Sequence, residues 1–467
     1  MWDKKMMLIY MIRVLFVLFF VYTVIYLFQM GISLCISIYR LEKYKKNKTL
    51  NRKLFPTAFA KRIPVSVIIP AYNEAACITE TIEALFEEDY LNLEIIVVDD
   101  GSNDNMESLV VKRFGLIKEP VLSEFELKAK PILRQYRKVF DEKTLILIHK
   151  ENGGKSDALN CGLNICHSPY CVMLDADTKV QRGSIRIMMS CFLMNPKTIV
   201  CAGAVGSENL KNYPKLTFLK KALVVFQILE YYRTFYMQRI MFDHINANII
   251  VSGAFAMFDT DLVKRVGGYQ VNTIGEDMEL TMRLHAFCAS QGKEYHIAYA
   301  PEAKCMTQLP FTYKDYYHQR RRWHIGLLQS MKFHKYMLGN KNYGWAGITS
   351  GTFFILYELL APFLEIIGVA TLIAANLLDI LNLQFTIQAT ILYTLIVIWI
   401  QAILVSAVNR YKVEPINGKQ RWILFLISIF EIVFFHPLNI VIKIIATAMN
   451  YWHRKSWEHI QRIETNR

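Results

Sequence analysis

The sequence predicts an α/β domain with a mostly parallel sheet, flanked by one N-terminal and two to three C-terminal transmembrane helices. The chain has 467 residues, of which 53% are hydrophobic, and its mean hydropathy is +0.21. A soluble protein of this size rarely averages out apolar. The long apolar stretches lie toward the two ends, and between them short β-branched runs alternate with segments of helical periodicity.

The first apolar stretch, residues 14–39, carries no charge. As a helix it would extend about 39 Å, which is enough to cross a bilayer with some tilt. A cleaved signal peptide would have a shorter apolar region, so we expect a retained anchor. The stretch is followed by the basic residues Arg40, Lys43, Lys45, Lys46, Lys48, Arg52 and Lys53. Such a cluster is typical of the cytoplasmic end of a span, so we expect a multi-pass protein of the cell (plasma) membrane with its central domain in the cytosol.

Three more apolar stretches lie at residues 348–377, 385–408 and 423–446. The first and last contain ionisable side chains, which are costly at membrane depth and should face the bundle interior or sit at the interface. Three full spans would place the basic C-terminal tail outside the cell. Either the break at His436–Pro437 makes a re-entrant hairpin, or part of 345–360 lies along the interface, and the sequence leaves both open.

These patterns divide the chain into five expected parts. They are an anchor with its basic flank (1–54), the α/β domain (55–325), an interfacial amphipathic helix (326–347), the C-terminal transmembrane region (348–449) and a basic tail (450–467). The net charge of +14 is explained by clusters beside the apolar stretches, so nucleic acid is not an expected partner. The nine cysteines include no CxxC pair and are expected to be reduced core residues.

The α/β domain begins with a β-branched run at 65–70, which ends in proline and predicts a buried strand. A helical pattern follows, and a second predicted strand at 93–98 ends in Asp99 and Asp100. Ligands of parallel α/β sheets bind just outside the carboxyl ends of the strands. We therefore expect the turns at 72–74 and 99–102 to share one crevice.

A third predicted strand at 145–148 precedes Asn152-Gly-Gly-Lys155 and a helix. Two glycines allow close backbone approach, and a lysine at a helix N-terminus suits phosphate, although a plain capping turn would explain the pattern equally well. A fourth predicted strand at 170–174 ends in Asp175-Ala-Asp177. Side chains two apart on a strand face the same side, so both carboxylates could hold one cation, and their hard oxygens suit Mg²⁺ or Mn²⁺. A solvated acidic turn is the alternative.

Residues 113–143, between the second and third predicted strands, are charged and helical in period. We expect them to form a peripheral insertion, and the sequence assigns them no function.

Six short stretches occur in a characteristic order: Ile69-Pro-Ala-Tyr-Asn-Glu74, Val98-Asp-Asp-Gly-Ser102, Asn152-Gly-Gly-Lys155, Asp175-Ala-Asp177, Gly275-Glu-Asp277 and Gln319-Arg-Arg-Arg-Trp323. Together they resemble the family 2 glycosyltransferases, in particular the membrane-bound processive synthases of cellulose, hyaluronan and poly-N-acetylglucosamine. The resemblance implies a GT-A-like nucleotide-sugar-binding domain and an inverting hexosyl- or N-acetylhexosaminyltransferase that uses Mg²⁺ or Mn²⁺.

The implied donor is a UDP-sugar, with UDP-N-acetylglucosamine or UDP-glucose favoured, and the implied acceptor is a growing polysaccharide. A non-processive transferase that acts on a membrane lipid acceptor is the alternative. Membrane lipid is a further expected partner, and accessory subunits are left open by the sequence.

The resemblance also implies roles for individual residues. The donor site is expected to comprise Tyr72, Glu74, Asp99, Asp100, Lys155, Asp175, Gln319 and Arg322. The metal ion is assigned to Asp177 with Asp175, and the acceptor to Ser252, Gly253 and Trp323. The catalytic residues are Asp277, as the base, and its neighbour Glu276.

The chemistry of these side chains agrees with those roles. An inverting sugar transfer needs a carboxylate within reach of the acceptor hydroxyl, and Asp277 opens a helical run, where an acid that complements the helix dipole is the alternative. The Arg322 guanidinium suits diphosphate oxygens and the Trp323 ring suits a sugar face, whereas a basic patch beside the membrane is the alternative. The stretch after Trp323 is amphipathic and would lie on the membrane surface. One departure is that Gly275 stands where the family commonly has threonine.

Overall fold

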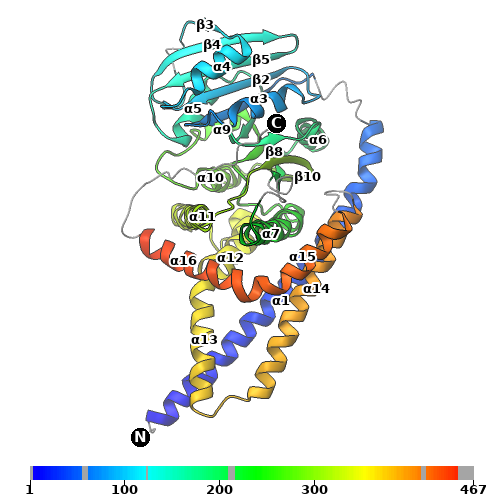
Figure 1. Cartoon of the computed structure of the whole chain (residues 1–467), viewed down its shortest axis with the longest axis vertical. Helices are drawn as coiled ribbons and strands as arrows, with labels where there is room; N and C mark the ends of the chain where they lie inside the picture. Colours follow the sequence, from blue (N-terminus) through cyan, green and yellow to red (C-terminus); the bar gives the residue numbers. More distant parts are fainter. Residues whose placement is uncertain (1–3, 55–61, 122–124, 209–215, 412–416, 451–467) are drawn as a thin grey trace.

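The computed structural model describes residues 4–54, 62–121, 125–208, 216–411 and 417–450 (Figure 1). The start of the expected α/β domain at residue 55 and the basic tail lie outside these residues. An α/β part occupies one end of the molecule. The apolar helices α1 (Lys4–Leu54), α13 (Ala361–Leu377) and α14 (Leu383–Arg410) project from it as a bundle of helices, which we call the leg. The N-terminus lies at the far end of this leg.

The α/β part is built on one ten-stranded sheet, in the order β3-β4-β5-β2-β1-β6-β9-β8-β10-β7. The strands are β1 (Val65–Ala71), β2 (Leu93–Asp99), β3 (Ile117–Glu119), β4 (Ile132–Phe140), β5 (Lys143–Lys150), β6 (Tyr170–Leu174), β7 (Lys179–Val180), β8 (Thr198–Ser207), β9 (Phe255–Asp259) and β10 (His296–Thr307). Four neighbouring strands, β5, β2, β1 and β6, are parallel as expected. The pairs β3–β4, β4–β5, β6–β9, β8–β9 and β7–β10 are antiparallel, so the sheet is mixed rather than mostly parallel.

The parallel strands form where the sequence predicts them because each contains a continuous apolar run that is buried on both faces. The helices of the α/β part are α3 (Ile78–Phe86), α4 (Met106–Phe114), α5 (Lys155–Ile165), α6 (Ser184–Met194), α7 (Phe218–Arg233), α8 (Arg239–His244), α9 (Thr260–Arg265), α10 (Glu276–Ser290) and α11 (Tyr313–Phe333). Helix α5 packs closely on β1 because Gly162 presents no side chain toward Ile68. This contact fixes Lys155, the first residue of α5, near the carboxyl ends of the parallel strands.

The prediction that 113–143 is helical is wrong. Helix α4 ends at Phe114, where Gly115 adopts a left-handed conformation (φ +62°), and the chain then forms the antiparallel hairpin of β3 and β4. Strand β4 pairs with β5 along its length, and Phe140 packs edge-on against Phe86 of α3 at a centroid distance of 4.9 Å. Strand β4 takes its hydrogen-bond partners from β5, and β3 takes its partners from β4. The helical periodicity of the segment does not indicate these partners.

Helix α11 continues to Phe333, so it crosses the expected domain boundary at 325–326. Leu327 and Met331, which were expected on a membrane-facing surface, are buried in a core with Phe242 and Phe353, whereas Phe333 and Tyr336 are about half exposed. The short helical turns η4 (Lys335–Met337) and η5 (Lys341–Tyr343) lead from α11 to the membrane region.

Three helices are long and apolar enough to cross a membrane: Met6–Lys46, Leu383–Arg410 and Gly418–Met449. A fourth apolar segment, Ala346–Leu359 with Ala361–Leu377, is bent by 50° at its break. The remaining elements of this region are η6 (Ala346–Ser350), α12 (Gly351–Phe354), η7 (Ile355–Leu359), α15 (Gly418–Phe430), η8 (Glu431–Phe435) and α16 (His436–Asn450). The segments η6, η7 and η8, like η3 (Thr234–Gln238) after α7, are π-helical turns, which occur often at functional sites.

The last helix, α16, lies across the base of the α/β part and does not project with the leg (Figure 1). It runs beside α11, where Asn439 accepts a hydrogen bond from the Tyr316 hydroxyl at 2.5 Å and Thr447 bonds His324 at 2.8 Å. Its other side exposes Val441 and Ile445. Helix α16 is therefore amphipathic, with its polar side against the α/β part.

Candidate active site

The carboxyl ends of β1, β2 and β6 lie side by side and carry the acidic turns that the sequence singles out. The turn at 72–74 follows β1, Asp99 and Asp100 end β2, and Asp175 and Asp177 follow β6. The first two turns are joined directly, because the Asn73 amide donates to the Ser102 hydroxyl at 2.9 Å and the Asn103 amide donates to the Asn73 side chain at 2.8 Å. They form one crevice wall, on which the Tyr72 side chain is exposed.

Both aspartates at the end of β2 are buried and hydrogen-bonded within the protein. Asp100 accepts from the Lys150 ammonium at 2.6 Å and from the Gly153 and Gly154 amides at 3.0 and 2.7 Å. Asp99 accepts from the Ser102 amide at 2.9 Å and lies 2.6 Å from His149 Nδ1. These contacts hold the Asp99–Ser102 turn against the glycine turn that precedes α5.

Lys155 connects this turn to the rest of the site. Its ammonium lies 2.8 Å from Asp175 Oδ1 and 3.0 Å from Glu276 Oε1. Burial alone would lower the pKa of Lys155, but the charges of the Asp175 and Glu276 carboxylates raise it above its usual value. The lysine therefore remains a cation, paired with two carboxylates in the described structure.

Asp277 stands at the start of α10, as predicted, and faces the loop that contains Ser252 and Gly253. Its carboxylate accepts hydrogen bonds from the Gly253 and Met278 amides, both at 2.8 Å. Burial and the neighbouring Glu276 charge raise the pKa of Asp277 to about 6, against the lowering effect of Lys155 and of the two amides. Such a carboxylate is ionised at neutral pH yet basic enough to take a proton.

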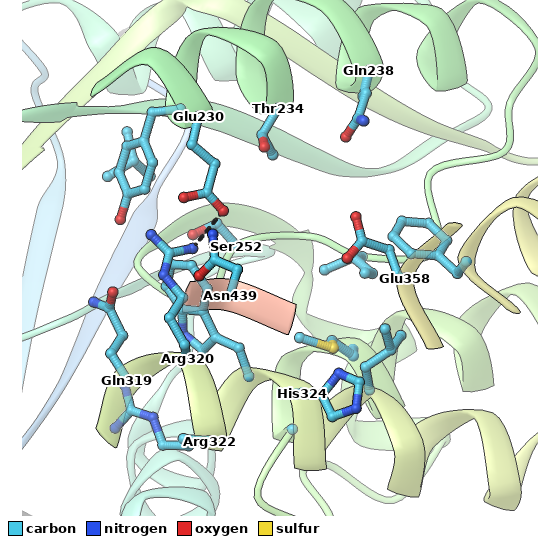
Figure 2. Close-up of a pocket in the computed structure, with 18 of the residues that line it drawn as sticks. Glu230, Thr234, Gln238, Ser252, Gln319, Arg320, Arg322, His324, Glu358 and Asn439 are labelled. Atoms are coloured by element: carbon cyan, nitrogen blue, oxygen red, sulfur yellow. Dashed lines mark hydrogen bonds and ion pairs between the residues drawn. The ribbon is translucent and has the colours of Figure 1, made fainter. Parts of the chain in front are cut away.

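A cavity of about 410 Å³ gathers most of the predicted residues. Its lining includes Lys155, Asp175, Asp177, Ser252, Gly253, Glu276, Asp277, Gln319, Arg322 and Trp323. Figure 2 shows Gln319, Arg320 and Arg322 of α11 on one side of it and Glu230, Thr234 and Gln238 on another. Tyr72, Glu74, Asp99 and Asp100 are not part of this lining and lie beyond the Gly153–Lys155 turn.

The segment 319–323 behaves differently from the prediction in one respect. Arg320 is the buried arginine of α11, with its guanidinium 4.4 Å from the Trp323 ring centroid and 2.7 Å from Glu230. This pairing fixes the Trp323 ring in the cavity wall through a cation–π contact. The Gln319 side-chain oxygen is buried with no hydrogen-bond partner among the described residues, so it can accept from a ligand.

Sequence reasoning missed the polar residues that α7 and η3 present to the cavity, namely Glu230, Thr234 and Gln238. They are scattered in an otherwise apolar helix, and only the fold shows which way they point. The ionisable residues of the apolar segments also line the cavity, and in pairs: Lys443 with Glu358 at 2.7 Å and His436 with Glu365 at 2.6 Å. Glu431, which is paired with Arg233, is buried among the helices, whereas the His436 side chain is 55% exposed.

Two groups of side chains could hold a cation. Among the described residues, ligand atoms of Asp99, Glu107 and His149 lie within 4.8 Å of one another, but Glu107 is already paired with Arg134 at 2.6 Å. Asp175 and Asp177 offer carboxylate oxygens directly to the cavity, which is the donor set that Mg²⁺ and Mn²⁺ prefer. The second group lines the cavity and the first does not, and an ion bound there would replace the Lys155 contact of Asp175.

Comparison with known proteins places this site in context. A family model described as "Glycosyltransferase like family 2" matches residues 62–326. The poly-beta-1,6-N-acetyl-D-glucosamine synthase of Staphylococcus epidermidis is 28% identical over 283 residues, which cover 60% of this chain and 59% of the relative. The synthase of the same name from Staphylococcus aureus (strain COL) is 28% identical over 263 residues, covering 56% of this chain and 54% of the relative. The chain thus matches less than two thirds of the length of these relatives.

Among solved structures, the chain is similar to the mannosyltransferase PcManGT from Pyrobaculum calidifontis in complex with GDP-Man and Mn²⁺. The two share 20% identity with a TM-score of 0.52, and the match covers 91% of this chain and 99% of that one. At this identity the likeness concerns the fold.

Proposed function

Because the chain belongs to the glycosyltransferase-like family 2, we propose that it is a membrane-bound inverting enzyme that transfers a sugar from a UDP-sugar to a growing polysaccharide. The chain has a mixed α/β fold of the GT-A-like type and is distantly related to poly-β-1,6-N-acetylglucosamine synthases. The observation that carries the proposal is one cavity in which Asp277, with its raised pKa, faces Lys155 and the acids Asp175 and Asp177.

In the proposed reaction an acceptor hydroxyl oxygen attacks the anomeric carbon of the donor sugar. The new carbon–oxygen bond forms as the bond to the diphosphate breaks, and the bonding electron pair leaves with the phosphate oxygen. The Asp277 carboxylate takes the hydroxyl proton, for which a pKa of about 6 is well matched at neutral pH. The Gly253 amide holds that carboxylate beside the loop assigned to the acceptor.

The leaving diphosphate requires positive charge. Lys155, at the N-terminus of α5, supplies an ammonium group, and Arg322 supplies a guanidinium from α11. Asp177 and Asp175 would hold Mg²⁺ or Mn²⁺, and the ion, when bound, neutralises the diphosphate. The nucleotide end of the donor is assigned to Tyr72, Glu74 and the Asp99–Ser102 turn. Gln319 offers an unsatisfied acceptor oxygen to the same donor.

The shape of the cavity favours an oligosaccharide acceptor. Trp323, held by Arg320, offers a flat face for a sugar ring. Beyond it the cavity continues to Glu358, Lys443 and Asn439, whose polar groups suit a polyhydroxylated chain. The alternative, a lipid-linked acceptor that receives one or a few sugars, draws support from Ala361 and Pro362, which lie in the same wall at the apolar helices.

For the membrane topology we propose three crossings, by α1, the bent segment that ends in α13, and α14. Helices α15 and α16 then lie along the membrane surface at the base of the α/β part, because α16 is hydrogen-bonded along α11 and exposes Val441 and Ile445 on its outer side. The basic flank of α1 favours a cytosolic α/β part, and three crossings put the basic tail on that same side. A protease-cleavable C-terminal tag that is accessible only from the outside of intact cells would contradict this topology.

The deciding experiment uses protein reconstituted in lipid vesicles with UDP-N-acetylglucosamine, UDP-glucose and GDP-mannose as donors. We expect turnover with a UDP-sugar and products of many residues. Short, discrete glycolipids would favour the non-processive alternative. Absence of transfer from every donor, with hydrolysis also absent, would contradict the enzyme assignment.

A further inference from the structure

The β3–β4 hairpin, which the proposed reaction leaves unused, is linked to the nucleotide end of the site by side chains at one level of the sheet. Asp99 on β2 is in register with His149 on β5, and His149 is in register with Arg134 on β4. The His149 Nδ1 atom lies 2.6 Å from Asp99 Oδ2. A row of side chains therefore runs from the hairpin to the Asp99–Ser102 turn.

Glu107, from α4, contacts both Arg134 and His149 of this row. The Arg134 guanidinium donates to its two carboxylate oxygens at 2.6 Å each, and the Tyr136 hydroxyl donates at 2.9 Å. The Oε2 atom of Glu107 also lies 3.5 Å from His149 Nδ1. The hydrogen bond from Arg134 lowers the pKa of Glu107, so this carboxylate is ionised and the guanidinium balances its charge.

A second row reaches Asp100. The Lys130 amide, two residues before β4 begins, donates to the Asp157 carboxylate at 3.1 and 3.2 Å. Asp157 Oδ1 lies 2.7 Å from the fully buried Lys150 ammonium, which in turn lies 2.6 Å from Asp100. Each aspartate that ends β2 is thus connected to the hairpin by its own chain of polar contacts.

We propose that the hairpin is a positioning element for nucleotide binding, and that Arg134, Glu107 and His149 act on the donor through Asp99. This inference rests on the proposed function. Asp99 accepts from the Ser102 amide, and Ser102 accepts from the Asn73 amide, so a displaced Asp99 carboxylate would loosen both turns of the crevice wall. A binding site must be held to within about 0.5 Å by its supporting residues, and that support is what the row provides.

Positioning accounts for these residues better than cation binding. The Arg134 guanidinium occupies both Glu107 oxygens in a bidentate pair, and His149 already lies at hydrogen-bonding distance from Asp99. A metal ion would have to displace both contacts. The side chains of the row form hydrogen bonds with one another and end at the Asp99–Ser102 turn. The proposed sugar transfer takes place in the cavity that Lys155 and Asp277 line.

The test compares Glu107→Gln and Arg134→Gln with Arg137→Gln in the full-length reconstituted protein. Arg137 is exposed on the same strand, three residues from Arg134 and therefore on the opposite face. For Glu107→Gln and Arg134→Gln we expect the dissociation constant for UDP and the donor KM to rise about tenfold, in line with other supporting-residue changes, while kcat stays within about twofold of wild type. Arg137→Gln should match wild type, and Tyr136→Phe, which removes one hydroxyl without changing the packing, should give a smaller rise in donor KM.

Several outcomes would overturn the inference. They are a wild-type donor KM in Glu107→Gln, an equal rise in Arg137→Gln, a loss confined to kcat, or saturable Zn²⁺ binding that disappears in Glu107→Gln. A wild-type protein that binds neither UDP nor GDP would contradict the proposed function itself, which separates the two failures.

Discussion

The Asp277 carboxylate is held by two backbone amides, one at each oxygen. In Asp277→Asn the single amide oxygen can still accept from the Gly253 amide, while the hydrogen bond from the Met278 amide and the proton acceptor are lost. We expect kcat to fall about 10²- to 10⁴-fold, the usual contribution of a general base, with the UDP dissociation constant within about twofold of wild type. Steady-state kinetics and calorimetry measure the two quantities.

Asp261→Asn is the matched control, because Asp261 is an exposed acid that is paired with its helix neighbour Arg265. Unchanged turnover in Asp277→Asn would rule out this carboxylate as the base.

The pH dependence of kcat/KM follows from the raised pKa of Asp277. The base acts when ionised, so kcat/KM should be level above about pH 6 and fall tenfold per unit below it. The charged groups near Asp277 are Glu276 on its own helix, Lys155 on α5 and Arg239 on α8. Because the Glu276 charge raises the pKa of Asp277, Glu276→Gln should move this fall to lower pH. A fall that stays in place or moves upward would contradict the coupling.

Removal of divalent ions tests the proposed metal-binding role of Asp175 and Asp177. Asp175 and Asp177 face the same cavity, so a chelator should abolish turnover and Mn²⁺ or Mg²⁺ should restore it. Asp177→Ala should resemble the chelated enzyme at low metal concentration. Full activity of the chelated wild type, verified by metal analysis, would exclude a metal role for this pair.

Helices α10 and α11 approach one another at Gly275, which precedes α10, and Gly326, which lies in α11. A Cβ atom on Gly275 would lie 2.8 Å from the Gly326 Cα atom, so the threonine that is common in this family at position 275 does not fit here. We expect Gly275→Thr to destabilise the protein by about 1–3 kcal/mol, as overpacking does, and to lower kcat because it shifts the α10 residue Asp277. Thermal unfolding and kinetics check both effects.

Gly418→Ala, at the start of α15, is the control for this change because no atom of the described residues lies within 4 Å of the added Cβ atom. Equal stability of Gly275→Thr and wild type would show that α11 can move away.

The elements differ in how far the sequence could predict them. Strands β1, β2 and β6 were predictable because each is a local run of mostly buried apolar residues that is followed by an acidic turn. The β3–β4 hairpin was not, since β3 pairs with β4 and β4 pairs with β5, and the helical periodicity of the segment does not indicate these partners. The signals for Lys155 and Asp277 were likewise local, because each stands at a predicted helix start.

The site as a whole was only partly predictable. The sequence led us to expect Asp100, Asp177 and Asp277 at one crevice; Asp177 and Asp277 line one cavity in the structure, whereas Asp100 is not part of its lining. The burial of Arg320 on Trp323 and the cavity face of α7 depend on how α7 and α11 rotate when they pack. That rotation is a property of the assembled molecule, and an apolar helix with a few polar residues does not specify it.

The pairing of α16 with α11 has a consequence for how the enzyme must be handled. Trp323 belongs to α11, and α11 rests on α16 through Tyr316–Asn439 and His324–Thr447, while the opposite side of α16 exposes Val441 and Ile445. Lateral pressure from the surrounding lipids should therefore reach the sugar-stacking ring through two packed helices. We expect extraction into short-chain detergent to slow turnover several-fold while UDP affinity is preserved, and return to native-thickness bilayers to reverse the loss. The detergent or lipid in which this protein is purified would then change its turnover rate.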